Sequence, residues 1–148
     1  MNVGYRNFEA RDFGDLSAMM YCLYEEDPEG QAIDDAKIEN TVLECAVNPE
    51  KLRIVMICAD ETIAGYGIIC FVWSNEYGGD ILTIDELYIK KEYRNRRLAS
   101  DFIRHHMSAY KNAAAIAVET TPSNKAAARL YGSLGFAPSQ NNHLVRKL

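Results

Sequence analysis

A run of basic residues stands between two candidate elements in the second half of the chain. Five of the eight residues from Lys90 to Arg97 are basic, and a helix is expected to begin near Leu98. A loop that enters a helix leaves backbone N–H groups unpaired, and with the helix dipole these groups can bind an anion such as a pyrophosphate. Basic side chains would add charge-assisted hydrogen bonds. A basic loop is also typical of a solvated surface, so this segment alone leaves both interpretations open.

Acidic residues are concentrated near the amino end of the chain. They are Glu25, Glu26, Asp27, Glu29, Asp34 and Asp35. Two local charges of opposite sign suggest two different ligand groups. The formal net charge of −5 argues against nucleic acid as a partner, because that affinity comes mostly from neutralised phosphates.

The segments around these charges alternate between strand and helix patterns. Apolar, β-branched stretches predict five strands, at Val3 to Phe8, Leu52 to Ala59, Ile63 to Ser74, Ile81 to Ile89 and Ala113 to Thr120. Apolar residues at helical spacing predict four helices, from Asp12 or Asp15 to about Glu26, from Asp34 to Ala46, from near Leu98 through Met107, and from Ser123 or Asn124 to Gly135. The buried face expected for the third helix consists of Leu98, Phe102, Ile103 and Met107. A final short strand could follow.

The order β-α-α-β-β-β-α-β-α-β predicts an α/β fold (mixed α+β). The sheet should be antiparallel in the central meander and parallel where helices cross over. A ligand is then expected at the carboxyl ends of the crossing strands.

Length and composition indicate one globular domain over residues 1–148, with 48% hydrophobic and 25% charged residues. The longest apolar run, Ile63 to Trp73, is too short to span a bilayer and is expected to be a buried strand. No secretory signal is present, so a cytoplasmic location is expected and no membrane partner. The cysteines form no Cys-x-x-Cys pair and are not spaced with the histidines as metal ligands, so core thiols and no metal are expected at Cys22, Cys45, Cys58 and Cys70.

Two segments resemble one enzyme family. Tyr93-Arg94-Asn95-Arg96-Arg97-Leu98-Ala99 resembles the Arg/Gln-x-x-Gly-x-Gly/Ala pyrophosphate loop of the GNAT superfamily of acetyl-CoA-dependent N-acetyltransferases. The segment from Asn124 to Phe136 is similar to the family's Asn-x-x-Ala-x-x-Leu-Tyr-x-x-x-Gly-Phe pattern at every specified position. The chain departs from the family at Arg97, where glycine is usual. A side chain there must either point away from the cofactor or reach a phosphate.

The resemblance implies a central mixed sheet with helices on both faces, and it implies roles for particular residues. The backbone of Leu87, Tyr88 and Ile89 would pair with the pantetheine arm of acetyl-CoA, and an N–H near Leu87 would polarise the thioester carbonyl. The pyrophosphate would be held by Arg94, Asn95, Arg96, Arg97, Leu98, Ala99 and Ser100. Asn124 would bind the cofactor, and Tyr131 would protonate the departing thiolate. Without the motif, Tyr131 would be interpreted as a core aromatic residue.

The adjacent acids Asp85 and Glu86 are candidates for accepting the proton of an acceptor amine. Consecutive strand residues face opposite sides of a sheet, so only one of them should point at the amine. We favour Asp85 for substrate contact and keep Glu86 as the alternative base, while both could simply charge a strand end. On the acceptor side, Tyr24, Glu26 and Asp27 could attract a cationic amine, although a solvated helix end explains them equally well.

The resemblance implies direct acetyl transfer to a primary amine. No Cys or Ser of the motifs stands beside a His, so a covalent enzyme intermediate has little support. The acceptor would be a small molecule, such as a polyamine, or the amine of a protein. The alternative is a weak or inert domain that binds CoA or acetyl-CoA as a sensor, which the departure at Arg97 motivates. Many family members are dimers, so a homodimer is also implied.

Overall fold

A five-stranded mixed sheet forms the centre of the protein. The structure is a computed structural model that describes residues 1–148. The strands lie side by side in chain order, as β1 (Val3–Asn7), β2 (Leu52–Ala59), β3 (Thr62–Ser74), β4 (Gly79–Ile89) and β5 (Ala113–Val118). Strands β1 to β4 are antiparallel, and β5 is parallel to β4. The predicted mixed sheet is therefore confirmed.

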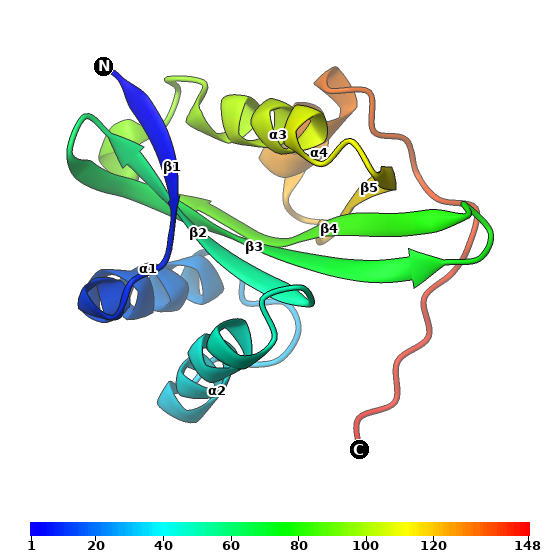
Figure 1. The fold of residues 1–148 in the computed structure, drawn as a ribbon, viewed down its shortest axis with the longest axis horizontal. Coiled ribbons are helices and arrows are strands. Elements are labelled where there is room, and N and C mark those ends of the chain that lie inside the picture. Colours follow the sequence, from blue (N-terminus) through cyan, green and yellow to red (C-terminus); the bar gives the residue numbers. More distant parts are fainter.

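Four helices cover the two faces of the sheet (Figure 1). They are α1 (Phe13–Glu26), α2 (Asp35–Val47), α3 (Leu98–Ala109) and α4 (Lys125–Ser133), with short 3-10 turns η1 (Ala10–Asp12) and η2 (Lys91–Tyr93). Helices α1 and α2 pack on one face, and α3 and α4 lie on the other. The predicted order of elements is confirmed except for the final strand, because residues 137–148 form neither helix nor strand.

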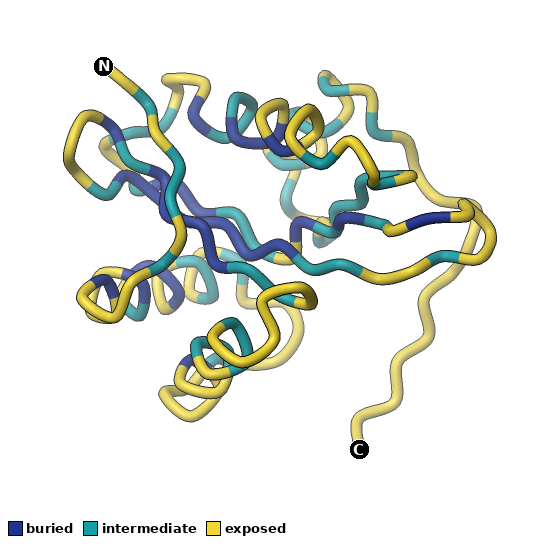
Figure 2. Tube along the Cα trace, in the orientation of Figure 1, coloured by how far each residue is buried: buried dark blue, intermediate teal, exposed yellow.

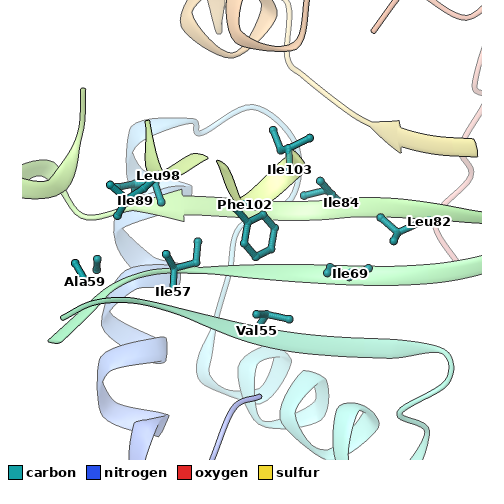
Figure 3. Packing of buried hydrophobic residues seen from close by; sticks show 11 residues of the cluster. Val55, Ile57, Ala59, Ile69, Leu82, Ile84, Ile89, Leu98, Phe102 and Ile103 are labelled. Carbon is teal, nitrogen blue, oxygen red and sulfur yellow. The ribbon is translucent and has the colours of Figure 1, made fainter. Parts of the chain in front are cut away.

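The sheet separates two apolar clusters. In Figure 2 the buried positions, in dark blue, lie mainly on the central strands and on α1 and α3. The α1 and α2 face is filled by Leu16, Met19, Met20 and Ile38 against alternate residues of β2 and β3. On the other face, Phe102 of α3 points at the sheet (Figure 3) and its ring lies over Gly67 of β3. Glycine is needed there, because an added Cβ would lie 2.8 Å from the ring carbon Cε1.

Two helix-start predictions have different outcomes. The second helix begins as expected after Asp34, whose carboxylate accepts the Lys37 N–H at 2.8 Å. Asp12 precedes α1, but its side chain does not cap that helix. Instead, the buried Asp12 carboxylate receives both guanidinium nitrogens of Arg6, at 2.6 and 2.8 Å.

Some predicted buried positions are wrong. The end of the run Ile63 to Trp73 is open to solvent, with Trp73 67% exposed, because the β3–β4 hairpin extends beyond the helices. Met107 is 47% exposed, and His106 takes its place against the sheet at 4% exposure. His106 follows Phe102 by four residues and shares its helix face, whereas Met107 is turned further round.

The expectation of core thiols holds only in part. Cys22 is exposed, and the other three cysteines are half-buried. All four are free thiols. No helix combines the length and apolar character that a membrane crossing requires. The structure places no group of three or more His, Cys, Asp or Glu side chains where they could hold a metal ion.

Candidate active site

A cleft of about 370 Å³ opens where β4 and β5 part. The two strands pair only up to Ile84 and Val118, while β4 continues to Ile89. The cleft is lined from α1 and the loop after it, from β4, from the β5–α4 loop and from α4, by Leu23, Tyr24, Asp27, Glu29, Ile84, Asp85, Glu86, Leu87, Glu119, Thr120, Thr121, Asn124, Ala127 and Tyr131. It lies at the carboxyl ends of parallel strands, where a ligand was predicted.

A β-bulge brings Asp85 and Glu86 to the same cleft. In the β3–β4 ladder, Ile68 pairs with Glu86 and Ile69 pairs with Ile84, so Asp85 has no partner on β3. The extra residue breaks the alternation of side chains along the strand. Both acids line the cleft, and the prediction that they face opposite sides is therefore wrong. The sequence around Asp85 contains no glycine that would have signalled the bulge.

The carboxylate of Glu86 is held by two tyrosines. Tyr24 of α1 donates its hydroxyl to Oε1 at 2.6 Å, and Tyr66 of β3 donates to Oε2 at 2.7 Å. Burial raises the pKa of Glu86, and the two hydrogen bonds oppose that shift because they favour the charged form. The sequence did not predict a functional role for Tyr66, because Tyr66 lies within an apolar stretch that predicts a buried strand.

Asp85 differs from Glu86 in having no hydrogen-bond partner within the protein. The walls of the cleft raise the pKa of Asp85 by desolvation, and Glu119 across the cleft adds like-charge repulsion. Two adjacent carboxylates therefore occupy different environments, one fixed by phenols and the other free to contact a ligand.

The acidic segment after α1 contacts the elements that flank the cleft. Asp27 accepts hydrogen bonds from Thr121, at 2.9 and 3.1 Å, and from the Asn124 amide at 3.5 Å. Glu29 accepts the Ser123 hydroxyl at 2.7 Å. Asp27 does line the cleft, but its carboxylate is bonded to the β5–α4 loop and does not stand free.

Glu26 lies outside the main cleft and pairs with Arg94. Its Oε2 accepts from Arg94 Nη2 at 2.7 Å, while Arg94 Nε donates to the Ile89 carbonyl at 2.9 Å. The Arg94 guanidinium also lies over the Tyr88 ring, 5.3 Å from its centroid. Arg94 therefore fastens the loop before α3 to the end of β4 and to α1.

The rest of the loop before α3 presents backbone donors. The N–H groups of residues 95–100 have no backbone acceptor. Asn95 and Arg97 have positive φ angles of 61° and 66°, and Arg97 is the residue immediately before α3. The Arg97 side chain is exposed. These unpaired N–H groups lie at the start of the twelve-residue helix α3, and donors in that position can bind an anion.

Helix α4 supplies the wall of the cleft opposite α1. Asn124 caps this helix, with its Oδ1 accepting the Ala127 N–H at 3.0 Å. Tyr131 packs edge-on against Phe136, with ring centroids 5.7 Å apart, and its hydroxyl has no partner within the protein. Burial raises the pKa of Tyr131, so the phenol stays protonated at neutral pH.

A protein-family model described as the acetyltransferase (GNAT) family matches residues 17–136. The chain belongs to the GNAT family. No curated protein matches the sequence. GNAT acetyltransferases use acetyl-CoA. Membership of this family supports acyltransferase activity for the chain.

Solved structures support the assignment of the GNAT fold. A possible acetyltransferase from Clostridium difficile 630 is 18% identical, with 100% of this chain and 99% of that chain covered and a TM-score of 0.85. A ribosomal-protein-alanine N-acetyltransferase from Brucella melitensis biovar Abortus 2308 is 14% identical, with coverage of 99% and 100% and a TM-score of 0.76. AAC(6')-Iy in complex with the bisubstrate analogue CoA-S-monomethyl-acetylneamine is 17% identical, with coverage of 100% and 99% and a TM-score of 0.75.

The GNAT motif residues are brought together around the cleft to different degrees. Asn124 and Tyr131 line the cleft. Leu87 also lines it, whereas the other two residues predicted to pair with the pantetheine arm do not. Tyr88 and Ile89 are buried side chains whose contribution would come from their backbone. Ser100 is turned toward its own helix, since its hydroxyl donates to the Arg97 carbonyl at 2.8 Å.

Proposed function

We propose that this GNAT protein transfers an acetyl group from acetyl-CoA directly to a primary amine. The observation that carries the proposal is the cleft itself, in which Asp85 and Glu86 on β4 face the same space as Tyr131 on α4. One wall supplies carboxylates that can take up the proton of an amine, and the other supplies a phenol that can give a proton. The cleft is lined by no Cys, Ser or His, so it holds none of the Cys–His or Ser–His pairs that commonly support a covalent acetyl-enzyme.

The residues present fit acetyl-CoA. Beyond Ile84, β4 has no strand on its β5 side, so the backbone of Leu87, Tyr88 and Ile89 can pair with an extended pantetheine arm. The unpaired N–H groups of residues 95–100 suit a pyrophosphate, and Arg96 and Arg97 add positive charge. Asn124 would contact the arm from the α4 side. Bound acetyl-CoA supplies the thioester that the amine attacks.

The side chains divide the proton transfers. Tyr131 protonates the departing thiolate. Because its pKa is raised, the phenol still carries its proton when the thiolate leaves. Asp85, which has no internal partner, contacts the acceptor amine. Glu86 is the second carboxylate available as a base. Arg94 acts on the loop through Glu26 and the Ile89 carbonyl, so its main role is to hold the loop in place.

The charge of the cleft favours a cationic acceptor. Five of its lining residues are acids, namely Asp27, Glu29, Asp85, Glu86 and Glu119, and none is Lys or Arg. A small polyamine-like amine fits this charge, and a protein amine is the second class of acceptor. Tyr24 and Asp27 belong to the acceptor side, with Glu26 acting from outside the cleft. A homodimer and a cytoplasmic location stay predictions.

A panel of amines tests the proposal. Thiol release from acetyl-CoA is measured with polyamines, aminoglycosides and peptides that carry a free amino end or a lysine. Turnover with at least one amine is expected, and D85N should lower it while D80N should not. Asp80 is the matched control because it is an exposed acid of the same strand, outside the cleft.

The alternative is a CoA or acetyl-CoA sensor without turnover. The observation in its favour is Arg97, which has a left-handed backbone at the entrance of α3 where the family usually has glycine. Calorimetric titration with acetyl-CoA separates the two functions. Tight binding with no thiol release on any amine would establish the sensor and exclude the enzyme.

A further inference from the structure

The two phenols that hold Glu86 are not equivalent. Tyr66 is fully buried at 0% exposure and approaches the carboxylate from within the sheet, away from the cleft. Tyr24 is half-buried and lines the cleft beside Glu86. One phenol therefore contacts only the protein interior, while the other is open to the space for the acceptor.

The hydroxyl of Tyr24 can make two kinds of hydrogen bond at once. A phenol has one O–H donor and accepts through the lone pairs of its oxygen. The donor is already directed at Glu86 Oε1, at 2.6 Å. The lone pairs have no donor within the protein, so they can accept an N–H from a cationic amine in the cleft.

We propose that Tyr24 relays the proton of the acceptor amine to Glu86, and that Tyr66 is the positioning residue that holds Glu86 for this transfer. The inference rests on the proposed acetyl transfer to an amine. The ammonium N–H bond breaks as its proton moves to the Tyr24 oxygen. The original Tyr24 proton moves to Glu86 Oε1 in the same event. The products are a neutral amine, a neutral Glu86 carboxyl group and an unchanged Tyr24 phenol.

The environments of the three groups suit a concerted relay. Burial and the hydrogen bond to Glu86 both raise the pKa of Tyr24, so a separate phenolate is disfavoured and both protons move together. Burial raises the pKa of Glu86, which makes this carboxylate a better proton acceptor. Tyr66 takes no part in the transfer, but its bond to Oε2 fixes the direction in which Oε1 points.

The test compares Y24F with Y66F, using the amine of the panel that gives the highest turnover. In Y24F the relay is cut, and at pH values below the pKa of the amine kcat should fall roughly 100-fold with little change in KM for the amine, within the range seen for positioned proton transfer. In Y66F the relay remains, so kcat at its plateau should fall less than about tenfold. Losing one donor to the charged carboxylate should move the acidic limb of the kcat/KM profile to higher pH.

A direct measurement of Glu86 accompanies the kinetics. Carbon-13 NMR of the side-chain carboxyl groups should show the pKa of Glu86 higher in Y66F than in the unchanged protein. Y21F is the matched control, because Tyr21 donates to Asp35 at 2.6 Å from the same helix but lies outside the cleft. It should change neither the kinetics nor the Glu86 titration.

Three outcomes would overturn the inference. Plateau kcat of Y24F within about threefold of the unchanged protein would mean that the amine reaches a carboxylate without Tyr24. A rise in KM at constant kcat would make Tyr24 a binding contact only. If the unchanged protein acetylates no amine, the proposed function fails and the relay with it, while the NMR titration still reports whether the phenols hold Glu86. Should Y66F fail to fold by circular dichroism, the half-buried Y24F decides the matter alone.

Discussion

Replacing Arg97 by glycine should stabilise the protein and weaken its binding of acetyl-CoA. The φ angle of Arg97 is 66° and its ψ is 4°, in the left-handed region. The conformation is held in place because the Arg97 carbonyl accepts the Asp101 N–H at 2.9 Å and the Ser100 hydroxyl at 2.8 Å. Left-handed backbone costs a residue with a Cβ roughly 1–2 kcal/mol.

The size of the effect follows from two opposing terms. Glycine removes that strain but loses about 0.5–1 kcal/mol more conformational entropy on folding. The difference leaves R97G more stable by about 0.5–1 kcal/mol, which corresponds to roughly 1–4 °C in Tm at this chain length. R97A is the control, because it removes the charged side chain and keeps the Cβ.

Binding should change in the opposite direction. Arg97 is exposed, so the loss of its charge near a pyrophosphate is worth about 0.2–1 kcal/mol. Both R97G and R97A should therefore bind acetyl-CoA about 1.5- to 5-fold more weakly, with a smaller difference in high salt. Urea denaturation and calorimetric titration measure the two effects. An R97G protein no more stable than R97A would refute the strain argument, and tighter binding by R97G would show that Arg97 obstructs the loop.

Three further changes test other parts of the structure. The Arg6 hydrogen bonds hold the pKa of the buried Asp12 below its ordinary value, so the ion pair stabilises the fold above about pH 4 and is lost as the pH falls further. D12N should lower the free energy of unfolding in urea by about 2–4 kcal/mol at pH 7 and by less at pH 3. G67A should cost about 1–3 kcal/mol in the same assay, since its Cβ would press on the Phe102 ring. Y131F should lower kcat roughly 100-fold with unchanged affinity for acetyl-CoA, and equal loss of affinity would make Tyr131 a packing residue.

The sequence was sufficient for the order of elements and for the motif segments. Apolar periodicity located every helix and all five strands to within a few residues, because amphipathic faces leave a pattern in the chain. The last predicted helix ends near Gly135, which has a φ of 90° that glycine adopts readily. Periodicity was less reliable for individual burial, as His106 and Met107 show, because one residue of rotation decides which side chain meets the sheet.

The arrangement of the site needed the tertiary structure. The bulge at Asp85 depends on how β4 pairs with β3. The register of this pairing cannot be predicted from the sequence of either strand by itself. The contact of Tyr66 with Glu86 joins residues twenty positions apart, and that of Tyr24 with Glu86 joins residues sixty-two apart. The sequence by itself determined which acids and phenols the chain carries and that it resembles the GNAT family. Only the fold decided which carboxylate is held by phenols and which stays free, because that depends on groups that meet across the sheet.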